Sequence, residues 1–280
     1  MTLSDSILAT LTYSDYFGFP LTFSEIMTRL IQCSVSQPSL ARQLRHMLAH
    51  HLIEQTGDYY HLPGRSRLAT RRLTRAGLST PLITRAYALT LRLAHLPGVL
   101  AIYLTGSLAL GNGDDTSDID LMIITHNGRL WTTRLLLTLL TQLLGLRRTP
   151  KSEHNFGKLC LNLYLTPASY LLPPTRRTLY TAYELIQAIP LYDPLNTRSD
   201  LLFANSWIQS YLPNFPLPQI IPSTIHHSPF TINFFEKLAY RLQLFYMHGK
   251  ITREYVTPNS AFFHPLNPGK SVLRRLSLKS

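Results

Sequence analysis

Residues 99–124 contain the feature that most constrains the fold, two apolar runs separated by a glycine–serine turn and a short polar loop. The first run, Val99 to Leu104, is continuously apolar, is bounded by turns and predicts a buried β-strand. It leads into Gly106-Ser107, and the second run opens with Asp118-Ile119-Asp120 and is then fully apolar. A strand, a turn, a short helical piece and a second strand in this order predict an α/β core.

The two aspartates at the start of the second strand are candidate metal ligands. Side chains at positions i and i+2 of a strand point to the same side, so Asp118 and Asp120 present two carboxylates to one point while Ile119 faces the interior. Their separation of about 6–7 Å along a strand suits hard divalent cations such as Mg²⁺. Gly106 permits close backbone approach, and Ser107 offers a hydroxyl and backbone N–H groups to a phosphate. A phosphate cradle beside metal carboxylates favours phosphoryl or nucleotidyl transfer.

The spacing of these residues resembles the signature of the polymerase-beta-like nucleotidyltransferase superfamily. Gly106-Ser107 is followed after ten residues by Asp118-Ile119-Asp120-Leu121 at the start of a strand. The resemblance implies an α/β nucleotidyltransferase core, a mixed sheet with flanking helices. It also implies that Asp118 and Asp120 hold Mg²⁺ or Mn²⁺ and that Gly106 and Ser107 contact a nucleoside triphosphate. A nucleoside monophosphate would then move to an acceptor hydroxyl, with release of pyrophosphate.

Active members of that superfamily place a third acid on a later strand, and this chain departs from the pattern. The matching strand is expected at 158–165, which contains no acid. Its alternating inner positions offer Cys160, Asn162 and Tyr164, or else only leucines, and Asn162 is the expected occupant. An amide oxygen is neutral and a poorer metal ligand. The remaining nearby acids are Glu153, Glu184 and Asp193, of which Asp193 is the candidate replacement.

Residues 1–64 predict three helices followed by a hairpin that turns at Gly57-Asp58. This order resembles the winged helix-turn-helix superfamily. A third helix used for DNA binding would present Arg42, Arg45, His46, His50 and His51. The net charge of this segment, three basic against five acidic residues, argues against strong phosphate neutralisation. The alternatives are a module for protein contacts or a rigid handle.

The positive charge is unevenly distributed along the chain. Of the net charge of +12, residues 65–97 contribute seven arginines without an acid, and residues 151–280 contribute thirteen basic against six acidic residues. Such a field favours anionic partners, nucleotides or nucleic acid among them. We expect a winged helix-like domain at 1–64, a basic helical connector at 65–97, the nucleotidyltransferase core at 98–195 and a helical C-terminal region at 196–280.

Composition excludes several classes of protein. With 45% hydrophobic residues the chain can form a core, and two cysteines exclude a disulfide scaffold and a cysteine-rich zinc module. Cys33 and Cys160 are interpreted as reduced, buried thiols. The most apolar stretch, Leu135–Leu146, is shorter than the ~20 residues of a membrane-spanning helix, and no targeting signal is recognised. We therefore expect a cytoplasmic protein without a membrane span.

Two functions from different classes follow. The first is Mg²⁺-dependent nucleotidyl transfer to an unknown acceptor hydroxyl, with Asp118 and Asp120 as ligands. The alternative is a catalytically weak or inactive nucleotide-binding regulator, coupled to a winged helix that binds DNA or protein. The absent third acid favours the regulator, and the intact pair of aspartates favours the enzyme.

Overall fold

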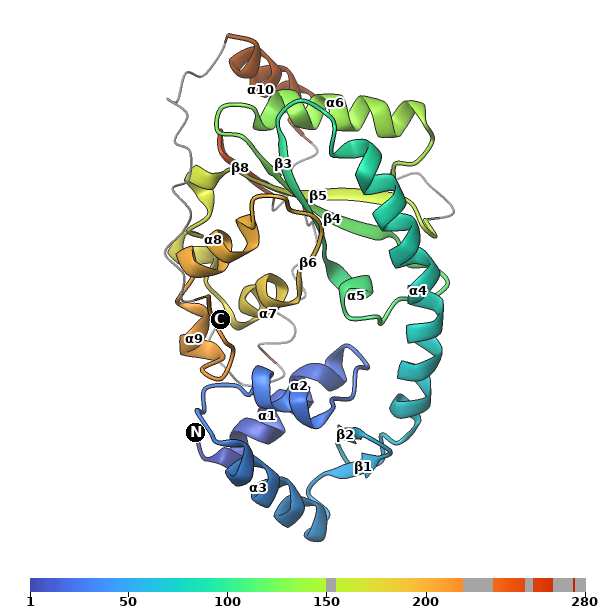
Figure 1. Cartoon of the computed structure of the whole chain (residues 1–280), viewed down its shortest axis with the longest axis vertical. Helices are drawn as coiled ribbons and strands as arrows, with labels where there is room; N and C mark the ends of the chain where they lie inside the picture. Colours follow the sequence, from blue (N-terminus) through green and yellow to red (C-terminus); the bar gives the residue numbers. More distant parts are fainter. Residues whose placement is uncertain (150–154, 219–233, 250–253, 264–273, 275–280) are drawn as a thin grey trace.

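A six-stranded mixed sheet forms the centre of the larger part of the molecule, as the computed structural model shows in Figure 1. The model describes residues 1–149, 155–218, 234–249, 254–263 and 274. The sheet has the order β6-β3-β4-β5-β8-β7, with β4 and β5 parallel and all other neighbours antiparallel. Its strands are β3 (Val99–Leu104), β4 (Ile119–Thr125), β5 (Leu159–Leu165), β6 (Ile189–Tyr192), β7 (Tyr255–Val256) and β8 (Ser260–Phe262).

Helices cover both faces of this sheet. Ile119, Leu121 and Ile123 pack toward α4 (Arg67–Leu93), α6 (Leu130–Leu143) and α10 (Phe234–Met247). Met122 and Ile124 of the same strand pack toward α7 (Leu179–Gln187), α8 (Thr197–Ala204) and α9 (Ile208–Tyr211). Because strand side chains alternate, Asp120 projects to the α7 side together with Met122. The mixed sheet with flanking helices fits the expected α/β nucleotidyltransferase core.

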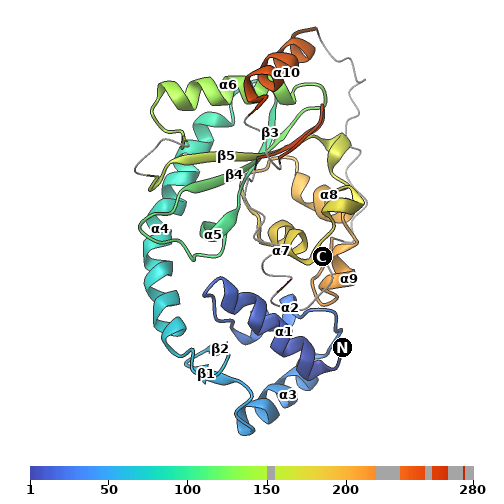
Figure 2. The same cartoon turned by 180° about the vertical axis from the view of Figure 1, so that it is seen from behind.

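An N-terminal module lies at the opposite end of the molecule (Figure 2). It consists of α1 (Leu3–Tyr16), α2 (Phe23–Arg29), α3 (Gln37–Ala49), β1 (Glu54–Thr56) and β2 (Tyr59–His61). The three helices and the hairpin thus occur in the expected order, around an apolar core of their own. The candidate DNA-contacting residues Arg42, Arg45, His46, His50 and His51 are all exposed. The assignment as a winged helix stays a prediction.

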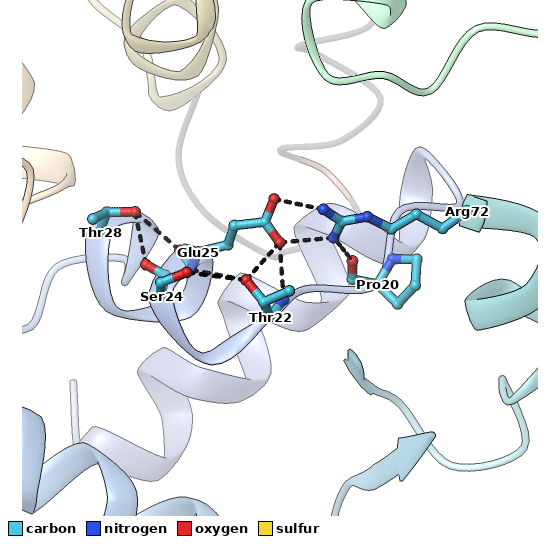
Figure 3. A network of polar contacts seen from close by, with 6 residues as sticks. All are labelled: Pro20, Thr22, Ser24, Glu25, Thr28 and Arg72. Carbon is cyan, nitrogen blue, oxygen red and sulfur yellow. Dashed lines mark hydrogen bonds and ion pairs between the residues drawn. The ribbon is translucent and has the colours of Figure 1, made fainter. Parts of the chain in front are cut away.

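The connector is one continuous helix, α4, which runs along one side of the molecule from the N-terminal module to the sheet (Figure 1). Arg72 of this helix forms two 2.7 Å hydrogen bonds to the two carboxylate oxygens of Glu25, and its guanidinium also donates to the carbonyl of Pro20. Figure 3 shows that Thr22 donates to the same carboxylate, which completes the capping box of α2. The connector is therefore anchored to the N-terminal module through Glu25.

The N-terminal module also packs directly on the core. The rings of Tyr13 and Tyr183 stack with their centroids 4.0 Å apart, and the Tyr183 hydroxyl donates to the carbonyl of Arg29 over 2.8 Å. The Asn112 side chain, from the loop after α5 (Gly106–Ala109), donates to the carbonyl of Phe17 over 3.1 Å. Tyr13 belongs to the same apolar cluster as the α7 face of the sheet. These contacts place the first 30 residues beside the glycine–serine turn.

Two expectations need correction. The C-terminal region is not only helical, since β8 pairs with β5 and β7 pairs with β8, so that both extend the central sheet. The first part of this region forms the two helices α8 and α9, and Asn205 caps the end of α8. The two cysteines are free, as expected, but both are partly exposed rather than buried. Within the described ranges, no helix combines the length and the apolar character needed to cross a membrane.

Candidate active site

The turn after β3 lies in direct contact with the carboxylate of Asp120. Gly106 has a φ of +67°, and a Cβ added there would lie 2.3 Å from Asp120 Oδ2. The adjacent Thr105 N–H donates to the carbonyl of Asp120 over 2.9 Å. Both the backbone angle and the close approach require glycine at this position. The turn and the second aspartate thus form one compact unit.

The two aspartates converge as predicted, and Cys160 joins them. One potential ligand atom from each of Asp118, Asp120 and Cys160 lies within 4.8 Å of the others. Ile119 between the aspartates is fully buried, as the alternation predicts. Cys160 stands directly beside Asp120 in the register of the parallel β4–β5 pair. The side chain across from the aspartate pair is therefore a thiol.

Asn162, the residue expected at this position, lies next to the site in another role. Its Nδ2 donates to Asp120 Oδ1 over 2.7 Å, so it orients the carboxylate. The register of β4 and β5 shifts after Leu161, which turns Tyr164 to the opposite face, where it is buried near α6. Strict alternation across β5, the basis of the expectation for Tyr164, fails at this shift.

Arg148 supplies a positive charge that the sequence analysis did not anticipate. Its Nη1 donates to Asp118 Oδ2 over 2.6 Å, and 45% of its side chain is exposed. The residue follows α6 and precedes β5 in the chain, and its backbone N–H donates to the carbonyl of Leu159 over 2.9 Å. The arginine pair 147–148 at the end of the apolar helical run was the available signal.

Burial shifts the protonation of the site. Burial, and next the charge of Asp118, raise the pKa of Asp120 to about 7. Burial and the neighbouring aspartate charges also raise the pKa of the Cys160 thiol. A cation beside these groups would oppose both shifts, because it favours the charged forms.

The donor atoms fit a divalent cation. Two carboxylates suit Mg²⁺ or Mn²⁺, whereas a thiolate favours softer ions such as Zn²⁺. Asp118 and Asp120 are thus the residues that would hold a metal ion, and Cys160 is the third donor in reach. This donor set differs from a set of three carboxylates because a thiol takes the place of the third carboxylate.

The other acids considered above have different places. Asp193 accepts hydrogen bonds from the Tyr103 hydroxyl and from the N–H groups of Thr197 and Arg198. It therefore stabilises the N-terminal end of α8. Glu153 lies outside the described residues. Glu184 on α7 is partly buried and lines a cavity of about 220 Å³ together with Gly106 and Ser107. Burial raises its pKa to about 7.

Comparison with known families supports the interpretation of the turn and the aspartate pair. The model of a family described as "Nucleotidyltransferase domain" matches residues 89–162, which include Gly106, Ser107, Asp118, Asp120 and Asn162. No curated protein and no solved structure matches the chain significantly. The matched segment contains β3, β4 and the start of β5. Residues 89–162 thus carry the pattern of a nucleotidyltransferase domain, at the place where the sheet brings the two aspartates to the glycine–serine turn.

Proposed function

We propose that this protein transfers a nucleoside monophosphate from a nucleoside triphosphate to an acceptor hydroxyl. The contact between the Gly106 turn and the Asp120 carboxylate carries the proposal. A phosphate held at Ser107 would lie beside the carboxylates that bind a divalent ion. In this arrangement one ligand contacts both the turn and the ion.

The reaction follows from what these residues can hold. The acceptor oxygen bonds to the α-phosphorus, the bond from this phosphorus to the bridging oxygen breaks, and pyrophosphate leaves. The acceptor proton passes to water or to a carboxylate of the site. A bound divalent ion supplies charge neutralisation for the phosphates. Asp118 and Asp120 hold the ion, and Arg148 is close enough to Asp118 to add positive charge at the same place.

A nucleotide-binding regulator is the second candidate, and two observations favour it. Cys160 stands where a third carboxylate would complete the metal site, and Arg148 is paired with Asp118. In a regulator, Arg148 would remain the counter-ion of Asp118, and nucleotide would bind without being transferred. The N-terminal module would then respond to occupancy of the site.

One assay separates the two candidates. Each of the four α-³²P-labelled triphosphates is incubated with the protein, a cell extract as acceptor source, and Mg²⁺, Mn²⁺ or Zn²⁺. The enzyme labels a product, and the combined change Asp118→Asn plus Asp120→Asn abolishes this labelling. The control is Asp115→Asn, an exposed acid of the same loop, which should leave labelling unchanged. Nucleotide binding without labelled product under all three metals supports the regulator instead.

A further inference from the structure

The cavity of about 220 Å³ beside the glycine–serine turn is formed by two separate parts of the chain. The N-terminal module contributes Phe17, Phe19 and Arg29, and the core contributes Ser107 and Glu184, among other residues. The module therefore forms a wall of the space into which the turn faces. Whatever binds at Ser107 and extends into this space meets side chains from α1 and α2.

Of the two arginines that line this cavity, Arg29 is the one without a salt bridge in the described part of the chain, and the charge of Glu25, which Arg72 pairs, still favours its charged form. No hydrogen bond or ion pair of its guanidinium occurs among the described residues. The nearest acid in sequence, Glu25, is held by both Nη atoms of Arg72 and by Thr22 (Figure 3). The guanidinium lies 5.8 Å from the centroid of the Phe19 ring. Burial lowers the pKa of Arg29, which reflects the cost of removing this charge from water.

The second arginine of the cavity differs from the first. Arg75 is 14% exposed in its side chain and donates to Asp114 over 3.0 Å and to Asn112 over 3.1 Å. Its charge is therefore compensated within the fold. A partly buried guanidinium without such partners gains most from an anion in the adjoining space, because phosphate and guanidinium form strong charge-assisted hydrogen bonds.

Two acids line the same cavity, Asp114, which Arg75 pairs, and Glu184. The Glu184 pKa of about 7, raised by burial, allows the neutral acid to persist near neutral pH. A neutral carboxyl group donates a hydrogen bond to a phosphate oxygen instead of repelling it. The acid is thus compatible with an anion beside Arg29.

We propose that Arg29 binds a phosphate group in the cavity that Ser107 also lines, so that the N-terminal module completes the substrate site. The inference rests on the proposed function in one respect, since the phosphate belongs either to the triphosphate or to a phosphorylated acceptor. Both sources share the same chemistry. The N-terminal module would then contribute a phosphate-binding residue to the site, regardless of any further contacts that α3 makes.

Isothermal titration calorimetry of the full chain tests this proposal. In the first arm, a nucleoside triphosphate with Mn²⁺ is titrated into the wild type, Arg29→Gln and Arg29→Lys. In the second arm, inorganic phosphate is titrated into the same proteins, alone and with a non-hydrolysable triphosphate present. Arg92→Gln is the control, because Arg92 is an exposed arginine of α4 that does not line the cavity. Circular dichroism and the midpoint of thermal unfolding establish that each variant is folded.

We expect Arg29→Gln to weaken binding at least tenfold in one arm, Arg29→Lys to restore part of it, and Arg92→Gln to leave it unchanged. Loss in the first arm assigns the site to the triphosphate, and loss in the second arm alone assigns it to a phosphorylated acceptor. Equal binding by wild type and Arg29→Gln in both arms, or no binding by the wild type, overturns the proposal. Arg29-dependent binding without transfer of label would refute the proposed enzyme and leave the phosphate site standing.

Discussion

Gly106 combines a left-handed backbone with a close approach to the Asp120 carboxylate. Replacing it with alanine adds a Cβ 2.3 Å from Asp120 Oδ2 and 3.1 Å from its Cγ, so the carboxylate must move. We expect Gly106→Ala to lower transfer at least tenfold and to destabilise the fold by about 1–3 kcal/mol. Transfer of labelled nucleotide and urea denaturation measure the two effects.

Gly111 provides the control for this change. It has a similar φ of +63°, but no atom lies within 4 Å of a Cβ added there. Gly111→Ala therefore carries the backbone strain of about 1–2 kcal/mol without the collision. Should both variants lose transfer equally, the approach of Gly106 to Asp120 would not be what the site requires.

Glu184 should make the stability of the protein depend on pH. Its pKa is about 7 in the folded chain and about 4.3 in an unfolded one, so the folded state binds more protons between these values. Stability therefore falls as pH rises from about 4 to about 7. We expect Glu184→Gln to remove its part of this decline, while Asp120, whose pKa is also raised to about 7, keeps its own part. The substitution should raise the free energy of unfolding at pH 8 by about 1–3 kcal/mol, with little effect at pH 4. Urea denaturation at both pH values measures the difference.

The exposed Asp115 is the matched acid for this comparison. Asp115→Asn removes a carboxylate of the neighbouring loop and should leave the difference between pH 4 and pH 8 as in the wild type. An unchanged pH profile in Glu184→Gln would mean that Glu184 is charged at neutral pH in the folded protein.

Among the elements, those with dense local signals could be predicted from the sequence. The apolar run 99–104 coincides with β3, and the aspartate pair lies at the start of the next strand, with Asp118 directly before β4 and Asp120 within it. The two strands at 255–262 were missed because they contain only two and three residues and derive their stability from pairing with β5. The sequence likewise contains no mark of the register shift in β5 that turns Tyr164 to the face opposite Asn162 and Asp120.

The Cys160 thiol on β5 leads to a prediction about which metal ions the site prefers. The thiol of Cys160 beside Asp120 should coordinate a soft ion, so the Co²⁺-loaded protein should show a thiolate charge-transfer band in the near ultraviolet. Cys160→Ser should lose the band, and Cys160→Asp should lose it while binding Mg²⁺ more tightly. Cys33→Ser is the control, since this thiol belongs to the N-terminal module. A band that survives Cys160→Ser would place the metal elsewhere.

At the scale of the whole molecule, the docking of the N-terminal module on the core was beyond sequence reasoning. It depends on pairs such as Tyr13 with Tyr183 and Phe17 with Asn112, which are separated by 170 and 95 residues in the chain. No local periodicity reports such contacts, because each side chain is compatible with many partners until the fold is complete. The position of Arg29 at the cavity could not be predicted from the sequence for the same reason, because it depends on the docking of the N-terminal module.

The Glu25–Arg72 pair should couple the module energetically to α4. The two side chains are 20% and 14% exposed and share two hydrogen bonds, so little solvent screens them. A double-mutant cycle with Glu25→Gln and Arg72→Met should give a coupling free energy of about 1–3 kcal/mol. The pair Asp118–Arg148 serves as comparison, because 45% of the Arg148 side chain is exposed and a single hydrogen bond joins the two residues. Its coupling should stay within about 1 kcal/mol.

Hydrogen exchange of residues 1–64 should rise in Arg72→Met and not in Arg148→Met, since Arg72 alone of these two joins α4 to the N-terminal module. Equal exchange in both variants would show that the aromatic contacts with α7 hold the module without help from the connector.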